Sequence, residues 1–216
     1  MWFYCPSIDS RGREGIPGWV VPSTSRCYDQ CMKPTRVNIR KVMDLATDAD
    51  RAEGLAWYGE AYEYASTLTP GNPAMGAGIL AALSPNTSWP QNKVRALTLV
   101  TTGEVRHFPD AVGKAKRILA GEEPLSVLGG PKVRSFYTDI MDLPNDVVTI
   151  DRHAIDIAMG KPLKNAERAP WQKGKAYATI ARMYTDVARE YGVTPNQLQA
   201  ITWVWWRKNK AVANHG

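Results

Sequence analysis

The sequence predicts an all-α fold, and two observations lead to this prediction, with one short extended segment as the exception. Apolar residues recur three and four positions apart through most of the chain from Asn38 onward, which is the spacing of an amphipathic helix. Residues that favour helix caps precede these segments, and glycines follow several of them. Residues 147–150 form a short β-branched segment with an extended pattern. The 216 residues allow one domain with an extension, and we expect a helical domain at 38–216 with about eight helices.

Four of these helices are expected before residue 122. Asp50 can cap the first, and Asn72 followed by Pro73 is the cap-then-proline order of a helix start. One face of the first helix carries Leu55, Tyr58, Tyr62 and Ala65, so we expect this face to be buried. By residue range, the four run from the Asp50 cap to Leu68, from Asn72 to Leu83, from Ser88 to Gly103, and from Phe108 to Ala120, before Gly121.

Four more helices are expected in the second half of the chain. They are Pro131–Met141, Arg152–Met159, a long helix that ends at Gly192, and a last helix that reaches about Lys208. The long helix has apolar residues three and four apart, which predicts one buried face made of Tyr177, Ile180, Tyr184, Val187 and Tyr191. Thr194-Pro195-Asn196-Gln197 has the pattern of a capping box, and it begins the last helix.

The first 37 residues differ from the rest, and we expect an irregular N-terminal arm at 1–37. Glycine, proline, serine and threonine are frequent there, and all three cysteines, Cys5, Cys27 and Cys31, lie within it. Three thiolates are one ligand short of the four that Zn²⁺ normally takes, and no adjacent histidine completes the set. We therefore interpret the cysteines as ordinary thiols, with a zinc site as the alternative and no other cofactor expected.

Charge is distributed unevenly along the chain. The formal net charge is +6, with +3 in residues 1–40, −4 in residues 41–160 and +7 in residues 161–216. A basic final quarter is suited to a polyanion such as nucleic acid, although a solvated basic face explains the same charge. The longest apolar stretches are far shorter than the about 20 residues that a membrane-spanning helix needs. We expect a cytoplasmic protein without a membrane partner.

Three segments, in order, resemble the helix-hairpin-helix DNA glycosylase superfamily, the group that includes endonuclease III. Ile79-Leu80-Ala81-Ala82-Leu83-Ser84-Pro85-Asn86, followed by Gln91-Asn92-Lys93, is similar to the family's early helix and the Val-Asn-Lys after it. Leu128-Gly129-Gly130-Pro131-Lys132 resembles the hairpin, and Val148-Thr149-Ile150-Asp151-Arg152-His153 resembles the Val-Asp-Thr-His motif. Gln197-Leu198-Gln199-Ala200 is similar to a later helix of the adenine-glycosylase branch. The resemblance covers roughly residues 70–207.

The resemblance implies two catalytic candidates. Asp151 corresponds to the acidic residue that stabilises positive charge on deoxyribose while the N-glycosidic bond breaks. It is also well placed to cap the helix that begins at Arg152, and the two roles are compatible. Lys132 lies 19 residues earlier, at the position of the Schiff-base lysine of bifunctional members. A phosphate-contacting or solvated lysine is the alternative, because a nucleophilic lysine must have a lowered pKa.

The same resemblance implies DNA as the partner. Gly129 and Gly130 would let the backbone approach phosphate, although a helix end followed by a proline helix start explains the same residues. Arg134 and Arg152 are candidate DNA contacts. Asn86 falls where members place the side chain that fills the gap left by an extruded base. Asn86 can equally be the polar end of a helix. Trp203 is expected in the core, whereas Trp89 is assigned either to the core or to base stacking.

Two departures from the family pattern leave a second function open. Pro131 replaces the second hairpin glycine and removes a backbone donor. No cysteine follows Cys31, so the family's iron–sulfur cluster is expected to be absent. The alternative to a glycosylase is a catalytically inactive module of the same fold that binds DNA or a protein. Similar compact proteins occur in bacteriophages, where DNA modification or host takeover is the expected role; a structural metal-binding protein is a third interpretation.

Overall fold

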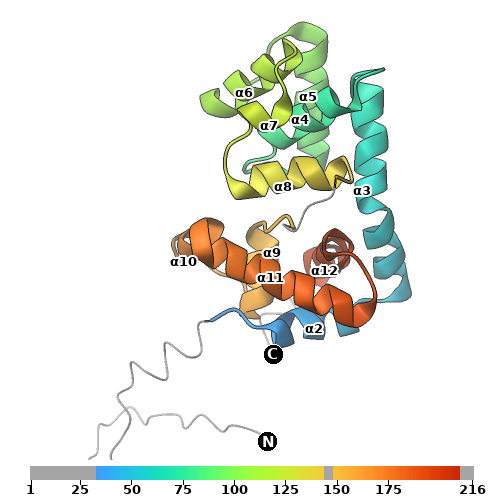
Figure 1. The fold of residues 1–216 in the computed structure, drawn as a ribbon, viewed down its shortest axis with the longest axis vertical. Helices are drawn as coiled ribbons and strands as arrows, with labels where there is room; N and C mark the ends of the chain where they lie inside the picture. The colour runs from blue at the N-terminus through green and yellow to red at the C-terminus, as the bar shows by residue number, and fades with distance from the viewer. Residues whose placement is uncertain (1–32, 144–147, 210–216) are drawn as a thin grey trace, which may run out of the picture. The chain divides into compact units, whose positions relative to one another are not determined.

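A computed structural model of the chain describes residues 33–143 and 148–209. This part contains eleven α-helices and one 3-10 helix and no strand, so the all-α prediction is confirmed (Figure 1). Cys5, Cys27, Cys31 and nearly all of the expected N-terminal arm lie outside the described residues. None of the described helices is both long enough and apolar enough to cross a membrane.

The helices keep the labels of Figure 1. They are α2 (Arg36–Leu45), α3 (Asp48–Leu68), α4 (Pro73–Leu83), α5 (Trp89–Thr102), α6 (Pro109–Leu119), α7 (Pro124–Val127), α8 (Pro131–Ile140), α9 (Arg152–Met159), α10 (Asn165–Arg168), the 3-10 helix η1 (Ala169–Gln172), α11 (Gly174–Tyr191) and α12 (Pro195–Asn209).

Helix α4 is the centre of a first group of helices. Its sequence is apolar all round, and every residue from Gly76 to Leu83 is buried, as expected for a helix surrounded by protein. Helices α3, α5, α6, α7 and α8 pack against it. Their apolar residues form one continuous core with α4, which includes Ala65, Leu99, Ile118 and Ile140.

Helix α12 is the centre of a second group, and α3 connects the two. Helices α2, α9 and α11 pack against α12, while α3 packs both on α12 and on α4 (Figure 1). Both contacts of α3 are close backbone contacts. A Cβ atom on Gly54 would lie 2.5 Å from Ile201 Cα, and one on Gly76 of α4 would lie 2.2 Å from the Ala65 carbonyl oxygen. Glycine is therefore required where these helices cross.

The segment before Asp151 is held by both groups. Asp139 of α8 accepts hydrogen bonds from the backbone N–H of Thr149 (3.0 Å) and from the Thr149 hydroxyl (2.7 Å). On the other side, the Tyr177 hydroxyl of α11 donates to the Val148 carbonyl (3.0 Å) and accepts from the Ile150 N–H (3.0 Å). These bonds satisfy the buried polar groups of a segment that belongs to no helix or strand. They also fix the position of the residue that follows.

Several predicted helix signals are confirmed. Asn72 and Asp151 are N-caps that accept backbone hydrogen bonds, and Gly103 and Gly192 end their helices in the left-handed conformation. The Thr194–Gln197 pair forms both bonds of the predicted capping box. The predicted face of α11 is buried at Tyr177, Ile180, Tyr184 and Val187.

Other expectations about the first helices are wrong. Thr47, not Asp50, caps α3; Asp50 is the partner residue of the capping box and pairs with Lys208 Nζ at 2.8 Å. Leu55 and Tyr62 are exposed, because α3 packs through the small residues Gly54, Ala61 and Ala65 instead. The arm ends earlier than residue 37, since Thr35 caps α2 and the helix begins at Arg36. Helix α2 and the short helices α7 and α10 were not among the predicted helices.

Two glycines of α3 give a matched test of the close contact with α12. Gly54→Ala should lower the free energy of unfolding by about 2 kcal/mol or more, because its Cβ meets the Ile201 backbone. Gly59→Ala, with no atom within 4 Å of the new Cβ, should raise it by about 0.5–1 kcal/mol through helix propensity. Urea unfolding measures both; similar changes for the two variants would contradict this account of the crossing.

Candidate functional site

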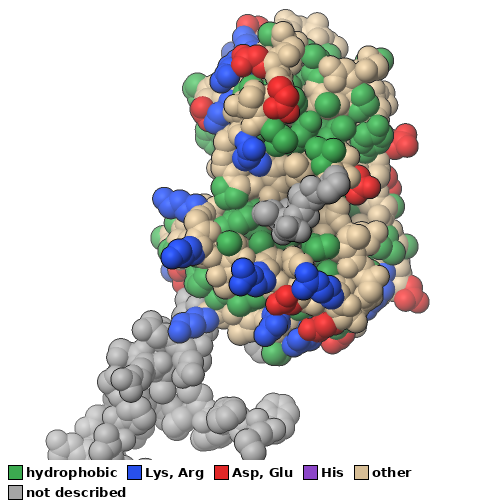
Figure 2. Space-filling view, viewed as in Figure 1, with side chains coloured by type: hydrophobic (Ala, Val, Ile, Leu, Met, Phe, Trp, Pro, Cys, Tyr) green, Lys and Arg blue, Asp and Glu red, His purple; other side chains and the backbone are tan. Residues whose placement is uncertain are grey.

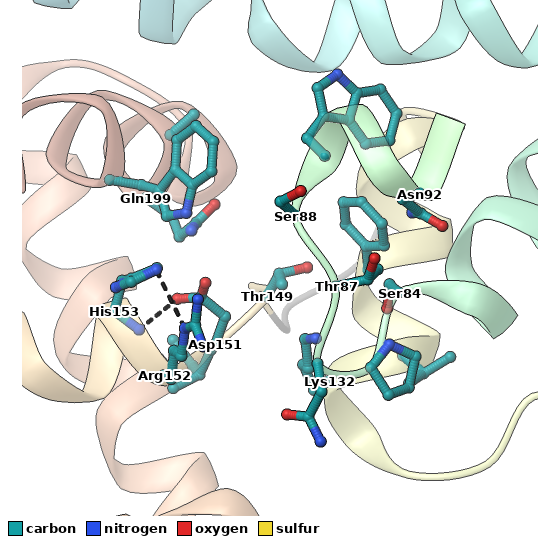
Figure 3. Close-up of a pocket in the computed structure, with 18 of the residues that line it drawn as sticks. Ser84, Thr87, Ser88, Asn92, Lys132, Thr149, Asp151, Arg152, His153 and Gln199 are labelled. Atoms are coloured by element: carbon teal, nitrogen blue, oxygen red, sulfur yellow. Dashed lines mark hydrogen bonds between the residues drawn. The ribbon is translucent and has the colours of Figure 1, made fainter. Parts of the chain in front are cut away.

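A cavity of about 620 Å³ is lined by residues of both helix groups. The first group contributes the α4–α5 loop and the start of α8, and the second contributes the start of α9 and part of α12. Figure 3 shows the cavity with Asp151, Arg152 and His153 on one side and Ser84, Asn92 and Lys132 on the other. Its volume is within the range of sites for small organic ligands.

Aromatic rings form much of the cavity wall. Trp57 of α3 is central to them, with ring centroids 5.2 Å from Trp89, 6.0 Å from Phe136 and 5.5 Å from Trp203. Tyr58 is beside it at 4.8 Å. Trp203 is half-buried and lines the cavity, so its expected place in the core is wrong; the Arg207 guanidinium lies 4.4 Å above its ring. Such a wall can stack against a flat ligand ring.

Asp151 caps α9 with one carboxylate oxygen. Oδ1 accepts from the backbone N–H groups of His153 (2.9 Å) and Ala154 (2.8 Å) (Figure 3). Oδ2 has no hydrogen-bond partner among the residues that the structure describes, and Asp151 is half-buried at the cavity wall. The cap and a chemical role are therefore compatible in geometry, because each uses a different oxygen.

Lys132 is in the first turn of α8 and lines the same cavity as Asp151. Its ammonium group forms no hydrogen bond and no ion pair with the described part of the chain. Burial lowers the pKa of Lys132 below its usual value; the Asp151 carboxylate opposes this shift and the Arg152 guanidinium adds to it. Net lowering favours the neutral amine, which is the nucleophilic form.

The predicted hairpin is the turn between α7 and α8. Gly130 has φ of +78°, a value that favours glycine, and Pro131 follows it as the first residue of α8. Gly130 lines the cavity, but Gly129 does not. Arg134 does not line it either: its guanidinium donates to the carbonyls of Leu125 and Leu128 (3.1 Å for the latter) and holds the turn against α8. Its predicted contact with DNA stays a prediction.

The cavity mouth is basic. Arg152 and Arg207 are exposed there and give two guanidinium groups beside the single carboxylate of Asp151. Asn86 is exposed at the same mouth, in the α4–α5 loop, with φ of +52°. Asparagine tolerates this left-handed conformation better than most residues do. Of the predicted site residues, the structure therefore brings together Asp151, Lys132, Gly130, Asn86 and Arg152.

A protein-family model described as a family of unknown function (DUF7178) matches residues 25–210, which is most of the chain. The chain belongs to this family. Neither the curated proteins nor the solved structures include a match. The matched range covers every residue of the cavity.

The sequence alone assigned no role to several residues that line the cavity. Gln199 accepts a hydrogen bond from the Tyr58 hydroxyl (2.9 Å) through Oε1, and Asn92 donates from Nδ2 to the Leu80 carbonyl (2.9 Å). Both are almost fully buried. A polar amide on an otherwise buried helix face was the signal that could have identified them. Trp57 and Phe136 gave no such signal, because aromatic residues at helical spacing are usually core.

The described residues contain no cluster of three or more His, Cys, Asp or Glu side chains that could hold a metal ion. The weak zinc candidates Cys5, Cys27 and Cys31 lie outside the described residues. This finding therefore does not test the alternative of a zinc site at the three cysteines.

The environment of Lys132 predicts how its reactivity depends on pH. Amine-reactive reagents modify the neutral form, so the midpoint for labelling Lys132 should lie below the usual pKa of a lysine side chain. Asp151→Asn removes the charge that raises the pKa of Lys132 and should lower this midpoint further. Arg152→Gln should raise it, because a charge that lowers the pKa is lost. Mass spectrometry of labelled peptides across pH gives the midpoints; a midpoint for Lys132 at or above the usual lysine value would contradict the assignment.

Proposed function

We propose that the protein is a DNA N-glycosylase that removes a damaged or modified base from duplex DNA. One observation carries this proposal: Lys132, whose pKa is lowered by burial, lines the same aromatic cavity as Asp151, whose Oδ2 is unbonded among the described residues. The cavity volume is sufficient for an extruded nucleotide, and its rings offer the stacking surface that base flipping requires. The two helix groups with a cavity between them fit the glycosylase-like bundle that the sequence motifs suggested.

Asp151 supplies the electrostatic part of the reaction. As the C1′–N bond breaks, its electron pair leaves with the base, which takes a proton from solvent, and positive charge develops on deoxyribose. Asp151 Oδ2 stabilises this charge and accepts a proton from the water that adds to C1′. Oδ1 stays bonded to α9, which holds the carboxylate in a fixed orientation during the step.

Lys132 supplies the nucleophile for a second, lyase route. Its neutral amine attacks C1′ in place of water and then loses a proton to Asp151 Oδ2. The base leaves with the electron pair of the C1′–N bond and takes a proton from solvent. The sugar ring then opens, its oxygen takes a proton, and the nitrogen forms the Schiff base with C1′. The lowered pKa of Lys132 favours the neutral form that this attack needs.

Exposed cations support DNA as the partner. Figure 2 shows Lys and Arg side chains gathered over the half of the surface that contains α10 and α11. Five exposed cations there form no ion pair within the described ranges: Lys161, Lys164, Lys173, Lys175 and Arg182. Unpaired cations release counterions from DNA phosphates when they bind. Asn86 at the cavity mouth would fill the space left in the duplex by the extruded base.

Base release from duplex DNA tests the proposal directly. Duplexes that each carry one damaged or modified base are incubated with the protein and treated with hot alkali, which cleaves abasic sites. At least one duplex should be cut, and Asp151→Asn should reduce the rate roughly 10²–10³-fold. Asparagine caps helices as well as aspartate does, so this variant should keep its fold and its affinity for DNA.

Lys132→Gln separates the two chemical routes. If Lys132 forms a Schiff base, borohydride should trap a covalent protein–DNA adduct with the wild-type chain and not with this variant. DNA binding without release of any base from the tested duplexes would contradict glycosylase activity, and the catalytically inactive binding module would then be the better account.

The basic face gives a separate prediction for binding. Lys175→Gln combined with Arg182→Gln should reduce the magnitude of the slope of log affinity against log salt concentration by about 2. The loss of affinity should be similar for every duplex sequence. Lys116→Gln is the control, because Lys116 of α6 already pairs with Glu104 of the α5–α6 loop at 2.5 Å. Fluorescence anisotropy at several salt concentrations measures the slopes; an unchanged slope in the double variant would show that this face does not contact DNA.

A further inference from the structure

Arg207 lies in the last turn of α12, and stacking holds its side chain at the cavity mouth. The guanidinium Cζ is 4.4 Å from the centroid of the Trp203 ring, and both residues line the cavity. Trp203 in turn packs edge-on against Trp57, with ring centroids 5.5 Å apart. An arginine that is already stacked on a ring has lost part of its freedom, so it binds a ligand at a smaller entropic cost.

The stacked guanidinium keeps its hydrogen-bond donors free. Stacking uses the face of the group, whereas its five N–H donors point outward in the plane. Arg207 is exposed, and it forms no hydrogen bond and no ion pair with the described residues. The next residue differs, because Lys208 pairs with Asp50 and Glu53, at 2.8 Å in each case. Arg207 is therefore an ordered cation without an acidic partner in the part of the chain that the structure describes.

The other side chains that line the cavity indicate what Arg207 binds. Among the described residues that line it, Asp151 alone is acidic, whereas Arg152 is a second exposed cation. Much of the wall is aromatic, and its rings can stack against a flat heterocycle. A ligand that fits both features combines a flat ring with an anionic group.

We propose that Arg207 binds a phosphate group of the nucleotide whose base enters the cavity. The edge of a guanidinium matches two phosphate oxygens at once, and such charge-assisted pairs are about twice as strong as neutral hydrogen bonds. A carboxylate fits the same edge; the choice of phosphate, like that of a nucleobase, rests on the proposed function. The site then takes a nucleotide in preference to a nucleoside, because a nucleoside leaves Arg207 without a partner.

A free nucleoside monophosphate and a DNA strand both carry such a phosphate. In DNA, the contact with Arg207 adds one charge to those of the basic face on α10 and α11. Arg207→Gln should therefore lower the magnitude of the salt slope for duplex binding by about 1. A loss of affinity for monophosphates with an unchanged duplex slope would support the phosphate contact and identify free nucleotides as its source.

Binding of 2′-deoxynucleosides and of their 3′- and 5′-monophosphates to the full chain tests the proposal. The emission of Trp57, Trp89 and Trp203 reports entry into the cavity, because all three line it. At least one monophosphate should bind saturably and about tenfold or more tightly than its nucleoside, as expected for a charge-assisted pair. Equal affinities within every pair, or no binding of any monophosphate, would overturn the proposal. Equally tight binding of inorganic phosphate would also overturn it, because the base would then contribute nothing.

Arg207→Gln distinguishes a phosphate contact from a role in the fold or in the aromatic wall. This variant should bind the monophosphate no more tightly than the nucleoside, while its nucleoside affinity and its melting temperature stay close to those of the wild-type chain. Arg117→Gln is the matched control with the same loss of charge, because the Arg117 guanidinium already pairs with Glu122 at 2.6 Å. It should keep the full preference for the monophosphate.

Two results with the variants would overturn the assignment. One is an equal loss of affinity for nucleoside and monophosphate in Arg207→Gln, since the phosphate would then not be the group that Arg207 contacts. The other is a preference for the monophosphate that is kept in Arg207→Gln and lost in Arg152→Gln, because the second cation of the cavity mouth would then hold the phosphate.

Mononucleotide binding involves no bond cleavage, so it separates this proposal from the proposed function. A chain that prefers monophosphates through Arg207 but releases no base from any duplex contradicts glycosylase activity and supports the phosphate contact. A chain that releases bases from duplexes, but whose affinity for monophosphates does not depend on Arg207, contradicts the phosphate contact alone.

Discussion

The hydrogen bonds on residues 148–150 are the constraint on which the candidate site depends. Asp139 holds Thr149 from α8, and Tyr177 holds Val148 and Ile150 from α11. An irregular segment at this depth would otherwise bury unpaired backbone groups, which is costly. Because the segment is fixed from both helix groups, Asp151 follows it at a fixed place, and its cap on α9 sets the orientation of the carboxylate. The position of the acidic group is therefore a result of the whole fold and not of α9 alone.

The surroundings of Asp151 and Lys132 act differently on the charged forms of these two side chains. Asp151 belongs to a helix N-terminus, where backbone N–H groups stabilise a carboxylate. Lys132 also begins a helix, where the same dipole opposes an ammonium group, and burial lowers its pKa further. Two helix N-termini line one cavity; one stabilises the carboxylate of Asp151 and the other disfavours the ammonium form of Lys132. The lowered pKa of Lys132 is in the direction that the proposed nucleophilic role needs.

Local signals in the sequence were enough for the fold class and most helix ends. Capping residues and glycines act within one turn, so Asn72, Asp151 and Gly192 could be identified without tertiary information. The buried face of α3 could not, because its contacts are made by glycine and alanine at crossings that depend on other helices. The same limit applied to the site. Asp151 and Lys132 were candidates by chemistry, while the places of Asn92 and Gln199 at the cavity depend on contacts with Leu80 and Tyr58, which are distant in the sequence.

Helix α3 has a consequence for how the two halves of the described chain unfold. Among the closely packed helix pairs in that part, α3 is the element that contacts both the α4 group and the α12 group. Each group has its own apolar interior, so the cooperativity between them depends on one helix and on residues 148–150. A molecule that fills the cavity adds contacts to both sides at once. Occupancy would then merge two partly independent transitions into a single one, and amide hydrogens far from the cavity would exchange more slowly.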